Sequence, residues 1–338
     1  MKAAYIESHG GPEVIKIGEL KEPELKEGYV KVRVKAVSLN HLDLWVRKGL
    51  PNLKIQFPHI LGSDIAGIIE DIKGEESLFK KGDKVILYPA TFCGVCDKCI
   101  SGKENLCKEY KILGENIWGG NAEFIVVKKE LIFPFPSDLS FEEASSLPLT
   151  LLTAMHMVKK SKIKPYQTAL VMAAGSGVSV MLIQILKALN VYVIATSSKK
   201  EKLERAKKIG VDEVINYSEN DWEKKLKGRT IDCIFDHTGK EFLPSLFRIV
   251  KWGGKIVTCG ATSGANANID LRYIFFKQIS LIGSTMGRRK DLLDGLQLVN
   301  MGKIKPVIYE VLPLEEIIKA HRMLEERKAF GKIVLKVS

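Results

Sequence analysis

The second half of the chain alternates short apolar segments with amphipathic ones, and this alternation constrains the fold more than any other feature. The segment "TALVMAA" (168–174) is typical of a buried strand, and "VMLIQILKALN" (180–190) has helical periodicity. The pair recurs in "VYVIATS" and "KEKLERAKKIG", and strand-like segments follow in "EVINY", "IDCIFDHTG", "KIVTCGAT" and "ISLIGSTM". Such β and α units predict an α/β fold with a doubly wound parallel sheet.

A glycine turn, "AAGSGVSV", joins the first strand to the first helix of this series. Gly175 and Gly177 let the backbone approach a pyrophosphate closely, and the helix that follows offers free N–H groups. Ser179 stands where such turns usually have a third glycine. The turn predicts a dinucleotide site, and an ordinary strand-to-helix turn is the alternative.

The end of the second strand indicates which dinucleotide is bound. An acidic residue would bind the ribose 2′-OH of NAD there. This chain has hydroxyl residues and then lysines, namely Thr196, Ser197, Ser198, Lys199, Lys200 and Lys202. Hydroxyl and ammonium groups attract a 2′-phosphate, so NADP(H) is favoured over NAD(H). The alternative is that these lysines simply face solvent.

The first 135 residues have a different sequence pattern, in which strands and turns are frequent. "YVKVRVKAVSL" alternates apolar and polar residues, "GSDIAGIIEDI" and "GDKVILYP" are further strands, and turn residues are frequent. This pattern predicts a small β-rich barrel or sandwich. The segment at 313–337 predicts a helix and a strand that either return to the first domain or stay with the second.

Four of the six cysteines lie together in "CGVCDKCISGKENLC". Inside a cell, four thiols this close indicate a metal site rather than two disulfides. Their spacing is C-x2-C-x2-C-x7-C, formed by Cys93, Cys96, Cys99 and Cys107. The other two, Cys233 and Cys259, lie in apolar segments and are expected to be buried.

Composition limits the partners of the chain. The 338 residues carry a net charge of +12, but the basic residues are spread along the chain among glutamates. This indicates a solvated lysine surface and makes nucleic acid an unlikely partner. Because no apolar run approaches the roughly 20 residues of a membrane span and the first residues lack a signal sequence, a cytoplasmic protein is expected.

Taken together, these motifs resemble the medium-chain dehydrogenase/reductase superfamily, in its zinc alcohol dehydrogenase and quinone oxidoreductase-like branches. The cysteine segment is similar to the structural-zinc lobe of that family, and "AAGSGVSV" and "GGKIVTCGATSG" resemble its quinone oxidoreductase branch. The resemblance implies a GroES-like catalytic domain at 1–148 with a zinc lobe at 91–110. It further implies a Rossmann domain at 149–298 and a C-terminal return at 299–338.

The resemblance implies one structural Zn²⁺ on the four cysteines, because four thiolates leave no open position for substrate. It also implies that this chain lacks the second, catalytic zinc site of the family. Asn40 and Ser63 stand where Cys and His ligands would be, Asp64 stands where a Glu would be, and the third ligand position falls on Leu149 or Leu151. A rebuilt site of His41, His59 and Asp64 is the alternative, since imidazole and carboxylate bind zinc.

Loss of the catalytic zinc favours hydride transfer to an activated double bond, where charge spreads onto a conjugated carbonyl. The leading hypothesis is an NADPH-dependent reductase of quinones, enones or enoyl compounds. The resemblance implies that Asn40 donates to substrate and that Asp43 holds its loop, with Asp64 nearby. Trp45 either stacks on a flat substrate or belongs to the domain core. His41 and solvent are both open as proton donors.

The resemblance also implies the residues around the cofactor. They are Thr153, Gly175, Ser176, Gly177, Val178, Ser179, Ser197, Ser198, Lys202, Tyr217, Gly260, Ala261 and Ser284.

Two alternative functions stay open. One is an alcohol dehydrogenase acting on a small-molecule alcohol or aldehyde, with the rebuilt metal site or without metal. The other is a nucleotide-binding protein with little catalysis. Family members are usually dimers or tetramers, so a homo-oligomer paired through "KQISLIGSTM" is expected.

Overall fold

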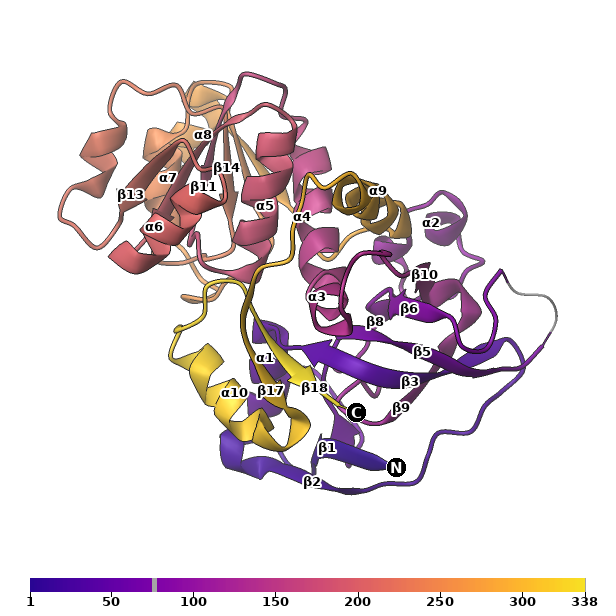
Figure 1. Cartoon of the computed structure of the whole chain (residues 1–338). Helices are drawn as coiled ribbons and strands as arrows, with labels where there is room; N and C mark the ends of the chain where they lie inside the picture. Colours follow the sequence, from indigo (N-terminus) through magenta and orange to yellow (C-terminus); the bar gives the residue numbers. More distant parts are fainter. Residues whose placement is uncertain (75–77, 338) are drawn as a thin grey trace. The chain divides into compact units, whose positions relative to one another are not determined.

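The computed structural model describes residues 1–74 and 78–337, and the chain divides into two compact units (Figure 1). The first unit comprises Met1–Leu149 and Pro306–Ser338, and the second comprises Thr150–Lys305. The last thirty-odd residues therefore belong with the first unit, although the second unit separates them from it in sequence. No helix among the described residues is long and apolar enough to cross a lipid bilayer.

The first unit is built around a seven-stranded sheet with the order β10-β6-β5-β3-β18-β17, in which β9 also pairs with β3. A three-stranded sheet (β2-β1-β4) and a two-stranded one (β7-β8) complete it. Its strands are β1 (Lys2–Ile6), β2 (Ile15–Glu19), β3 (Tyr29–Ser38), β4 (His59–Ile60), β5 (Asp64–Ile72), β6 (Lys84–Leu87), β7 (Ala90–Thr91), β8 (Lys111–Ile112), β9 (Phe124–Lys128), β10 (Ile132–Pro134), β17 (Ile308–Pro313) and β18 (Lys332–Lys336). Its helices are η1 (Pro12–Val14), α1 (His41–Lys48), α2 (Asp97–Ile100), η2 (Glu104–Leu106), η3 (Lys129–Leu131), α3 (Phe141–Ser145), η5 (Leu314–Glu316) and α10 (Ile317–Glu325).

The strand β3 is the centre of this unit, and its alternating sequence explains why. Val30, Val32 and Val34 are buried, while the residues between them are partly exposed. The strand pairs with β5, β9 and β18, all antiparallel. The pairing with β18 sets Val334 opposite Ser38, and the pairing with β5 sets Asp64 opposite Ser38. Strand ends from three distant segments therefore meet next to Asn40.

The second unit contains a six-stranded sheet with the order β13-β12-β11-β14-β15-β16, in which every pair is parallel. The predicted doubly wound sheet is confirmed. The strands are β11 (Thr168–Val171), β12 (Tyr192–Ser197), β13 (Glu213–Asn216), β14 (Cys233–Asp236), β15 (Lys255–Thr258) and β16 (Ser280–Gly283). The helices are α5 (Gly177–Ala188), α6 (Lys200–Lys208), η4 (Trp222–Leu226), α7 (Leu243–Ile249), α8 (Leu271–Lys277), α9 (Arg289–Asn300) and α4 (Pro148–Ser161), which begins two residues before this unit.

Helices cover both faces of this sheet. In Figure 1, α5 and α6 lie in front of the strands, and α7 and α8 lie behind them. Leu170, Ile194 and Ile234 pack with residues of η4 and α7 in one buried cluster. Strands that are apolar on both faces need cover on both, which is the reason that the sheet is parallel and central.

Candidate active site and metal centre

The glycine turn leads from β11 into α5, where Ser176 is the N-cap. Its hydroxyl accepts a hydrogen bond from the Ser179 N–H at 3.1 Å. A methyl group on Gly175 would lie 2.6 Å from Cδ and 3.2 Å from Nζ of Lys202, so this lysine lies directly over the glycine and would have to move if a side chain stood there. The fully buried Ser179 donates to the Met172 carbonyl at 2.7 Å, which ties the helix to the strand. A serine in place of the third glycine thus adds a bond.

His237 stands beside this turn and was missed in the sequence. Its Nε2 lies 2.8 Å from Ser176 Oγ and 3.0 Å from Ser179 Oγ. Because the Ser179 hydroxyl already donates to Met172, its contact with Nε2 requires an N–H on that nitrogen. Burial lowers the pKa of His237, so the neutral ring is expected. The only sequence signal was a histidine directly after the strand "CIFD".

The predicted cofactor residues fit a bound dinucleotide in part. Thr153 Oγ1 and Ser284 Oγ are both buried and have no hydrogen-bond partner, which fits groups that await a ligand. Thr196 does not fit the prediction, because it is fully buried and its hydroxyl points at Met172 Sδ, 3.5 Å away. Tyr217 is partly buried and packs against Phe242, with ring centroids 4.6 Å apart and the rings tilted by 57°.

A buried polar cluster lies where the three strand ends of the first unit meet. Asp64 Oδ2 accepts hydrogen bonds from Asn40 Nδ2 at 2.8 Å, Lys332 Nζ at 2.8 Å and Ser38 Oγ at 3.3 Å. Its Oδ1 accepts from the Leu149 N–H at 2.5 Å. Asp64, predicted as a catalytic residue, is fully buried with both oxygens bonded, so it positions its neighbours rather than touching substrate.

Asp43 holds the segment that carries Asn40. Its carboxylate accepts from the Asn40 N–H at 2.7 Å and from the Gly62 N–H at 2.9 Å. Burial raises the pKa of Asp43 to about 6, and the two N–H bonds oppose this shift. The carboxylate therefore fixes the start of α1 against the loop before β5.

The residues at the expected catalytic zinc position do not fit that ion. Ser63 Oγ donates to the Leu113 carbonyl at 2.7 Å, and Asn40 Oδ1 accepts from Lys332 at 2.6 Å. Leu149 and Leu151 are buried and apolar. Zinc binds thiolate, imidazole or carboxylate, and none of these occupies the three positions.

The rebuilt histidine site does not form either. His59 is buried in β4 with its Nε2 3.2 Å from the Gly114 carbonyl, and burial lowers its pKa. The His41 ring lies 6.4 Å from the Trp45 ring. Among the described residues, only the four cysteines form a group of three or more metal-binding side chains.

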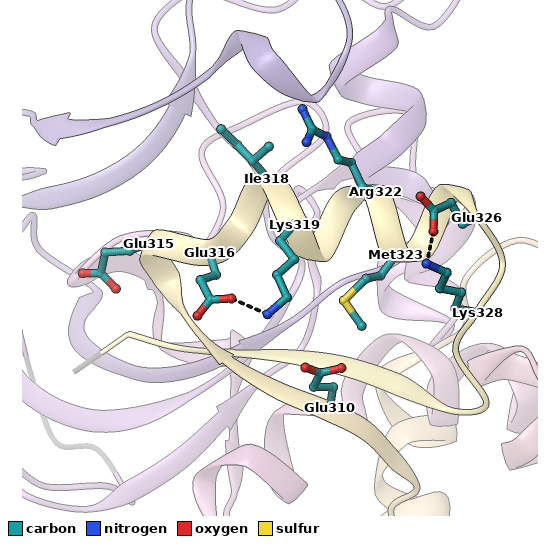
Figure 2. A pocket seen from close by; sticks show the side chains of 9 residues that line it. All are labelled: Glu310, Glu315, Glu316, Ile318, Lys319, Arg322, Met323, Glu326 and Lys328. Atoms are coloured by element: carbon teal, nitrogen blue, oxygen red, sulfur yellow. Dashed lines mark hydrogen bonds and ion pairs between the residues drawn. The ribbon is translucent and has the colours of Figure 1, made fainter.

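A surface hollow elsewhere in the first unit does not coincide with any predicted site residue. Figure 2 shows charged side chains of β17, α10 and its flanks around it. Glu316 pairs with Lys319 at 2.6 Å and Glu326 with Lys328 at 2.5 Å. Exposed pairs of this kind indicate a solvated surface rather than a binding pocket.

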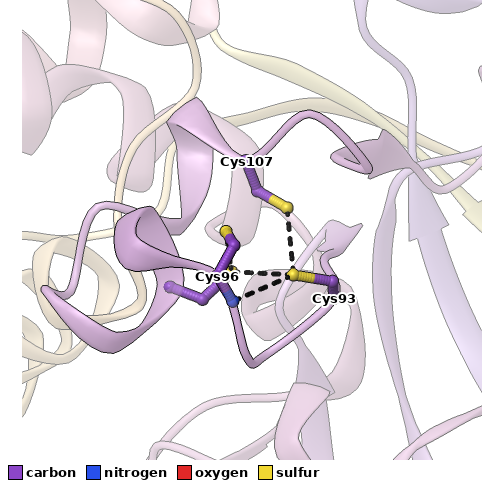
Figure 3. A group of neighbouring side chains, drawn as sticks. Cys93, Cys96 and Cys107 are labelled. Carbon is purple, nitrogen blue, oxygen red and sulfur yellow. Dashed lines mark hydrogen bonds between the residues drawn. The ribbon is translucent and has the colours of Figure 1, made fainter.

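The four cysteines come together in one group that could hold a metal ion, as predicted, and Figure 3 labels Cys93, Cys96 and Cys107. The Sγ–Sγ distances are 3.8 Å for Cys93–Cys99, 3.6 Å for Cys96–Cys99 and 3.6 Å for Cys107–Cys93. A tetrahedral zinc with Zn–S bonds of about 2.3 Å needs sulfur atoms about 3.8 Å apart. Burial raises the pKa of Cys99 to about 12, whereas backbone N–H groups lower the pKa of Cys93 to about 6, so Cys99 in particular needs a bound cation to ionise.

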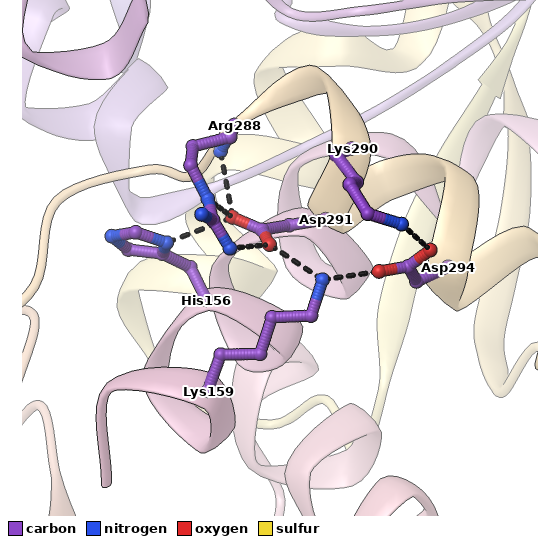
Figure 4. Close-up of polar contacts among 6 residues, drawn as sticks. All are labelled: His156, Lys159, Arg288, Lys290, Asp291 and Asp294. Carbon is purple, nitrogen blue, oxygen red and sulfur yellow. Dashed lines mark hydrogen bonds and ion pairs between the residues drawn. The ribbon is translucent and has the colours of Figure 1, made fainter. Parts of the chain in front are cut away.

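A second ionic cluster lies between α4 and α9 in the second unit (Figure 4). The fully buried Asp291 accepts from His156 Nδ1 at 2.8 Å, Lys159 Nζ at 2.8 Å, and Arg288 Nη2 at 2.7 Å and Nε at 3.0 Å. A carboxylate only accepts, so Nδ1 of His156 carries the proton. These bonds outweigh burial and hold the pKa of Asp291 well below its ordinary value. No local sequence pattern indicated this network.

Comparisons with known proteins agree with this geometry. A family model described as an alcohol dehydrogenase GroES-like domain matches residues 26–137, and one described as a zinc-binding dehydrogenase matches 177–300. An alcohol dehydrogenase of Geobacillus stearothermophilus is 32% identical over the full length of both chains. A crotonyl-CoA carboxylase/reductase of Cereibacter sphaeroides is 29% identical, over 93% of this chain and 82% of its own. A solved structure described as an NAD-dependent alcohol dehydrogenase is 43% identical over all of both chains, with a TM-score of 0.97.

The fold and site define a two-domain nicotinamide-dependent oxidoreductase. The chain belongs to the medium-chain dehydrogenase/reductase superfamily, in its zinc-type alcohol dehydrogenase branch. The family resemblance of the sequence is therefore confirmed, and the chain is an enzyme rather than a nucleotide-binding protein with little catalysis.

We expect one zinc per chain, bound by the four cysteines. Cys99→Ser should lower the zinc content from one to below about 0.1 per chain and lower Tm, because three thiolates bind zinc far more weakly than four. Cys259→Ser, outside the cluster, is the control and should keep its zinc. Elemental mass spectrometry and thermal unfolding measure both. Two zinc ions per wild-type chain would contradict the conclusion on the catalytic position.

We also expect Asp291 to stabilise the second unit. Asp291→Asn should lower the free energy of unfolding by about 3 kcal/mol, because Lys159 and Arg288 lose their buried anionic partner. Asp294→Asn, whose side chain is 23% exposed, is the control and should cost below about 1 kcal/mol.

The effect of Asp291 should depend on pH. The folded-state pKa of Asp291 is lowered, so its contribution is present above its unfolded pKa of about 3.9 and is lost as pH falls below it. Urea unfolding at pH 7 and pH 3 should show the difference between wild type and Asp291→Asn shrinking in acid. A difference that is constant with pH would refute the ionic role.

Proposed function

We propose that this enzyme interconverts an alcohol and its carbonyl compound, with a nicotinamide dinucleotide as hydride carrier. The observation that carries the proposal is the 43% identical structure, alike over its full length and described as an NAD-dependent alcohol dehydrogenase. The sequence had favoured reduction of an activated double bond and kept alcohol–carbonyl chemistry as an alternative. The names of the relatives favour the alternative.

The chemistry rests on hydrogen-bond donors rather than on a metal. A bound nicotinamide supplies or accepts the hydride. Asn40 is the member of the polar cluster with the most exposure, at 8%, and we infer that its amide is the group that reaches a substrate oxygen. Asp43, through the Asn40 backbone, and Asp64, through its side chain, hold that amide in one orientation. A fixed donor stabilises the charge that develops on oxygen during hydride transfer.

Reduction of a conjugated double bond is the second candidate. Two observations favour it, namely the absence of catalytic zinc ligands at Asn40 and Ser63 and the likeness to a crotonyl-CoA carboxylase/reductase. In this reaction hydride goes to the β-carbon and charge reaches oxygen through conjugation. The same Asn40 donor serves both reactions.

We propose that NADP(H) is the preferred cofactor. Lys202 lies over the glycine turn at Gly175, and no carboxylate ends β12. Ser198, the residue directly after β12, is exposed. Ser197 is buried, and its hydroxyl accepts a hydrogen bond from the Lys199 N–H. Lys202 and Ser198 are thus the groups best placed for a 2′-phosphate.

We also propose pairing of two chains through the edge strand β16, with a solution mass twice 37.7 kDa as its measure. The strand exposes Leu281, and the neighbouring α8 exposes Leu271, Phe275 and Phe276. An apolar edge of this kind is typical of an interface.

One substrate distinguishes the two reactions. Cinnamaldehyde contains a carbonyl and a conjugated double bond, so we expect NADPH or NADH deuterated at C4 to label C1 and give cinnamyl alcohol. Deuterium at C3 would instead establish double-bond reduction. Product analysis by mass spectrometry and NMR reads the position. No turnover here or with a panel of alcohols, ketones and quinones would refute both candidates.

The cofactor proposal predicts a charge effect at one residue. Wild type should bind NADPH at least tenfold more tightly than NADH. Lys202→Ala should weaken NADPH about tenfold and leave NADH unchanged, because only NADPH carries the 2′-phosphate. Lys207→Ala, later on the same helix, is the control. Fluorescence titration gives each Kd, and equal wild-type values for the two cofactors would contradict the preference.

A further inference from the structure

Lys332 is a buried cation that the sequence did not reveal. It begins β18, and its side chain is 3% exposed. Its ammonium donates to Asp64 Oδ2 at 2.8 Å and to Asn40 Oδ1 at 2.6 Å. The strand register explains the meeting, since Leu39 N–H donates to the Ile333 carbonyl and Val334 faces Ser38.

The ion pair with Asp64 compensates the charge of Lys332 but engages only one of the three N–H donors of its ammonium. A second donor is satisfied by the amide oxygen of Asn40 rather than by another carboxylate. It closes a ring in which Lys332 donates to Asn40 Oδ1, Asn40 Nδ2 donates to Asp64 Oδ2, and Asp64 accepts from Lys332. A cation on an amide oxygen draws electron density from the amide nitrogen, which makes its N–H groups stronger donors.

We propose that Lys332 is a positioning residue that polarises the Asn40 amide, so that the second Nδ2–H of Asn40 binds the substrate oxygen where zinc acts in other members of the family. The proposal rests on the proposed function, because it assigns a role at the same site. Lys332 itself is enclosed by Asp64 and Asn40 and acts through Asn40.

Through Asn40, Lys332 would assist the transfer of a hydride between nicotinamide and substrate. In the reductive direction a hydride leaves C4 of the reduced nicotinamide, which becomes oxidised, and forms a C–H bond with the substrate. The electron pair of the carbonyl π bond moves to oxygen, directly or through the conjugated double bond. The Asn40 N–H stabilises that oxygen until it, or the α-carbon, takes a proton from solvent.

Removing the ammonium alone would leave the Asp64 carboxylate buried without its cation, and such a variant is prone to unfold. The test therefore uses the neutral pair Asp64→Asn/Lys332→Met. We expect it to remain folded, to bind reduced cofactor within about twofold of wild type, and to lose about 100-fold in kcat. Lys336→Met, an exposed lysine on the same strand, is the matched control and should keep wild-type kcat.

A mutant cycle separates this role from simple structural support. Asn40→Ala should also lose about 100-fold in kcat. If Lys332 acts through Asn40, the triple variant should fall no more than about threefold below Asn40→Ala. A folded Asp64→Asn/Lys332→Met variant with kcat within about threefold of wild type would overturn the proposal. So would losses that multiply in the triple variant.

A measurement without turnover keeps this test separate from the proposed function. In protein labelled with ¹⁵N-asparagine, the Asn40 side-chain signal is the one that Asn40→Ala removes. It should shift in Asp64→Asn/Lys332→Met and again when cinnamaldehyde and oxidised cofactor are added to wild type. Shifts without any turnover would refute the proposed function alone. A signal that moves in neither experiment would overturn the role of Lys332.

Discussion

The buried ion pair between Lys332 and Asp64 is the interaction on which the first unit depends. Asp64 begins β5, Lys332 begins β18, and β3 lies between them in the sheet. Both charged groups are buried away from solvent. Each is therefore stable only while both strands keep the register on β3 that brings the two groups together. Asn40 follows β3 directly and is bonded to both partners. The pair thus couples the return of the C-terminus to the shape of the site, so that folding of the sheet and assembly of the donor are one event.

In the second unit, hydroxyl groups hold the glycine turn in place. A glycine at position 179 would let helix and strand approach without making any bond, whereas Ser179 bonds both the Met172 carbonyl and, with Ser176, the ring of His237. The cofactor turn is thereby held by three segments before any ligand arrives. The buried hydroxyls of Thr153 and Ser284 have no such partners, and a buried hydroxyl without a hydrogen bond costs free energy.

The sequence predicted what local spacing determines. The cysteine centre lies within fifteen residues, and the parallel sheet follows from strand and helix periods, so neither needs long-range information. The ring of Asn40, Asp64 and Lys332 spans 292 residues and depends on the register of β18 on β3, which no local pattern specifies. The inward turn of Thr196 has the same origin, because a strand residue faces core or solvent according to its register. His156 and Asp291 meet only because α4 and α9 pack together.

The donor role that we propose for Asn40 also limits which substrates the enzyme can act on. Zinc lowers the pKa of bound water from 15.7 to about 7, and that scale of stabilisation lets alkoxides form at neutral pH. A charge-assisted hydrogen bond contributes only about 1.5–3 kcal/mol, which is one to two powers of ten. A site that relies on such a bond works best on substrates whose developing charge is already delocalised. Conjugated aldehydes and enones meet this condition whether hydride goes to the carbonyl carbon or to the β-carbon, so both candidate reactions converge on one substrate class.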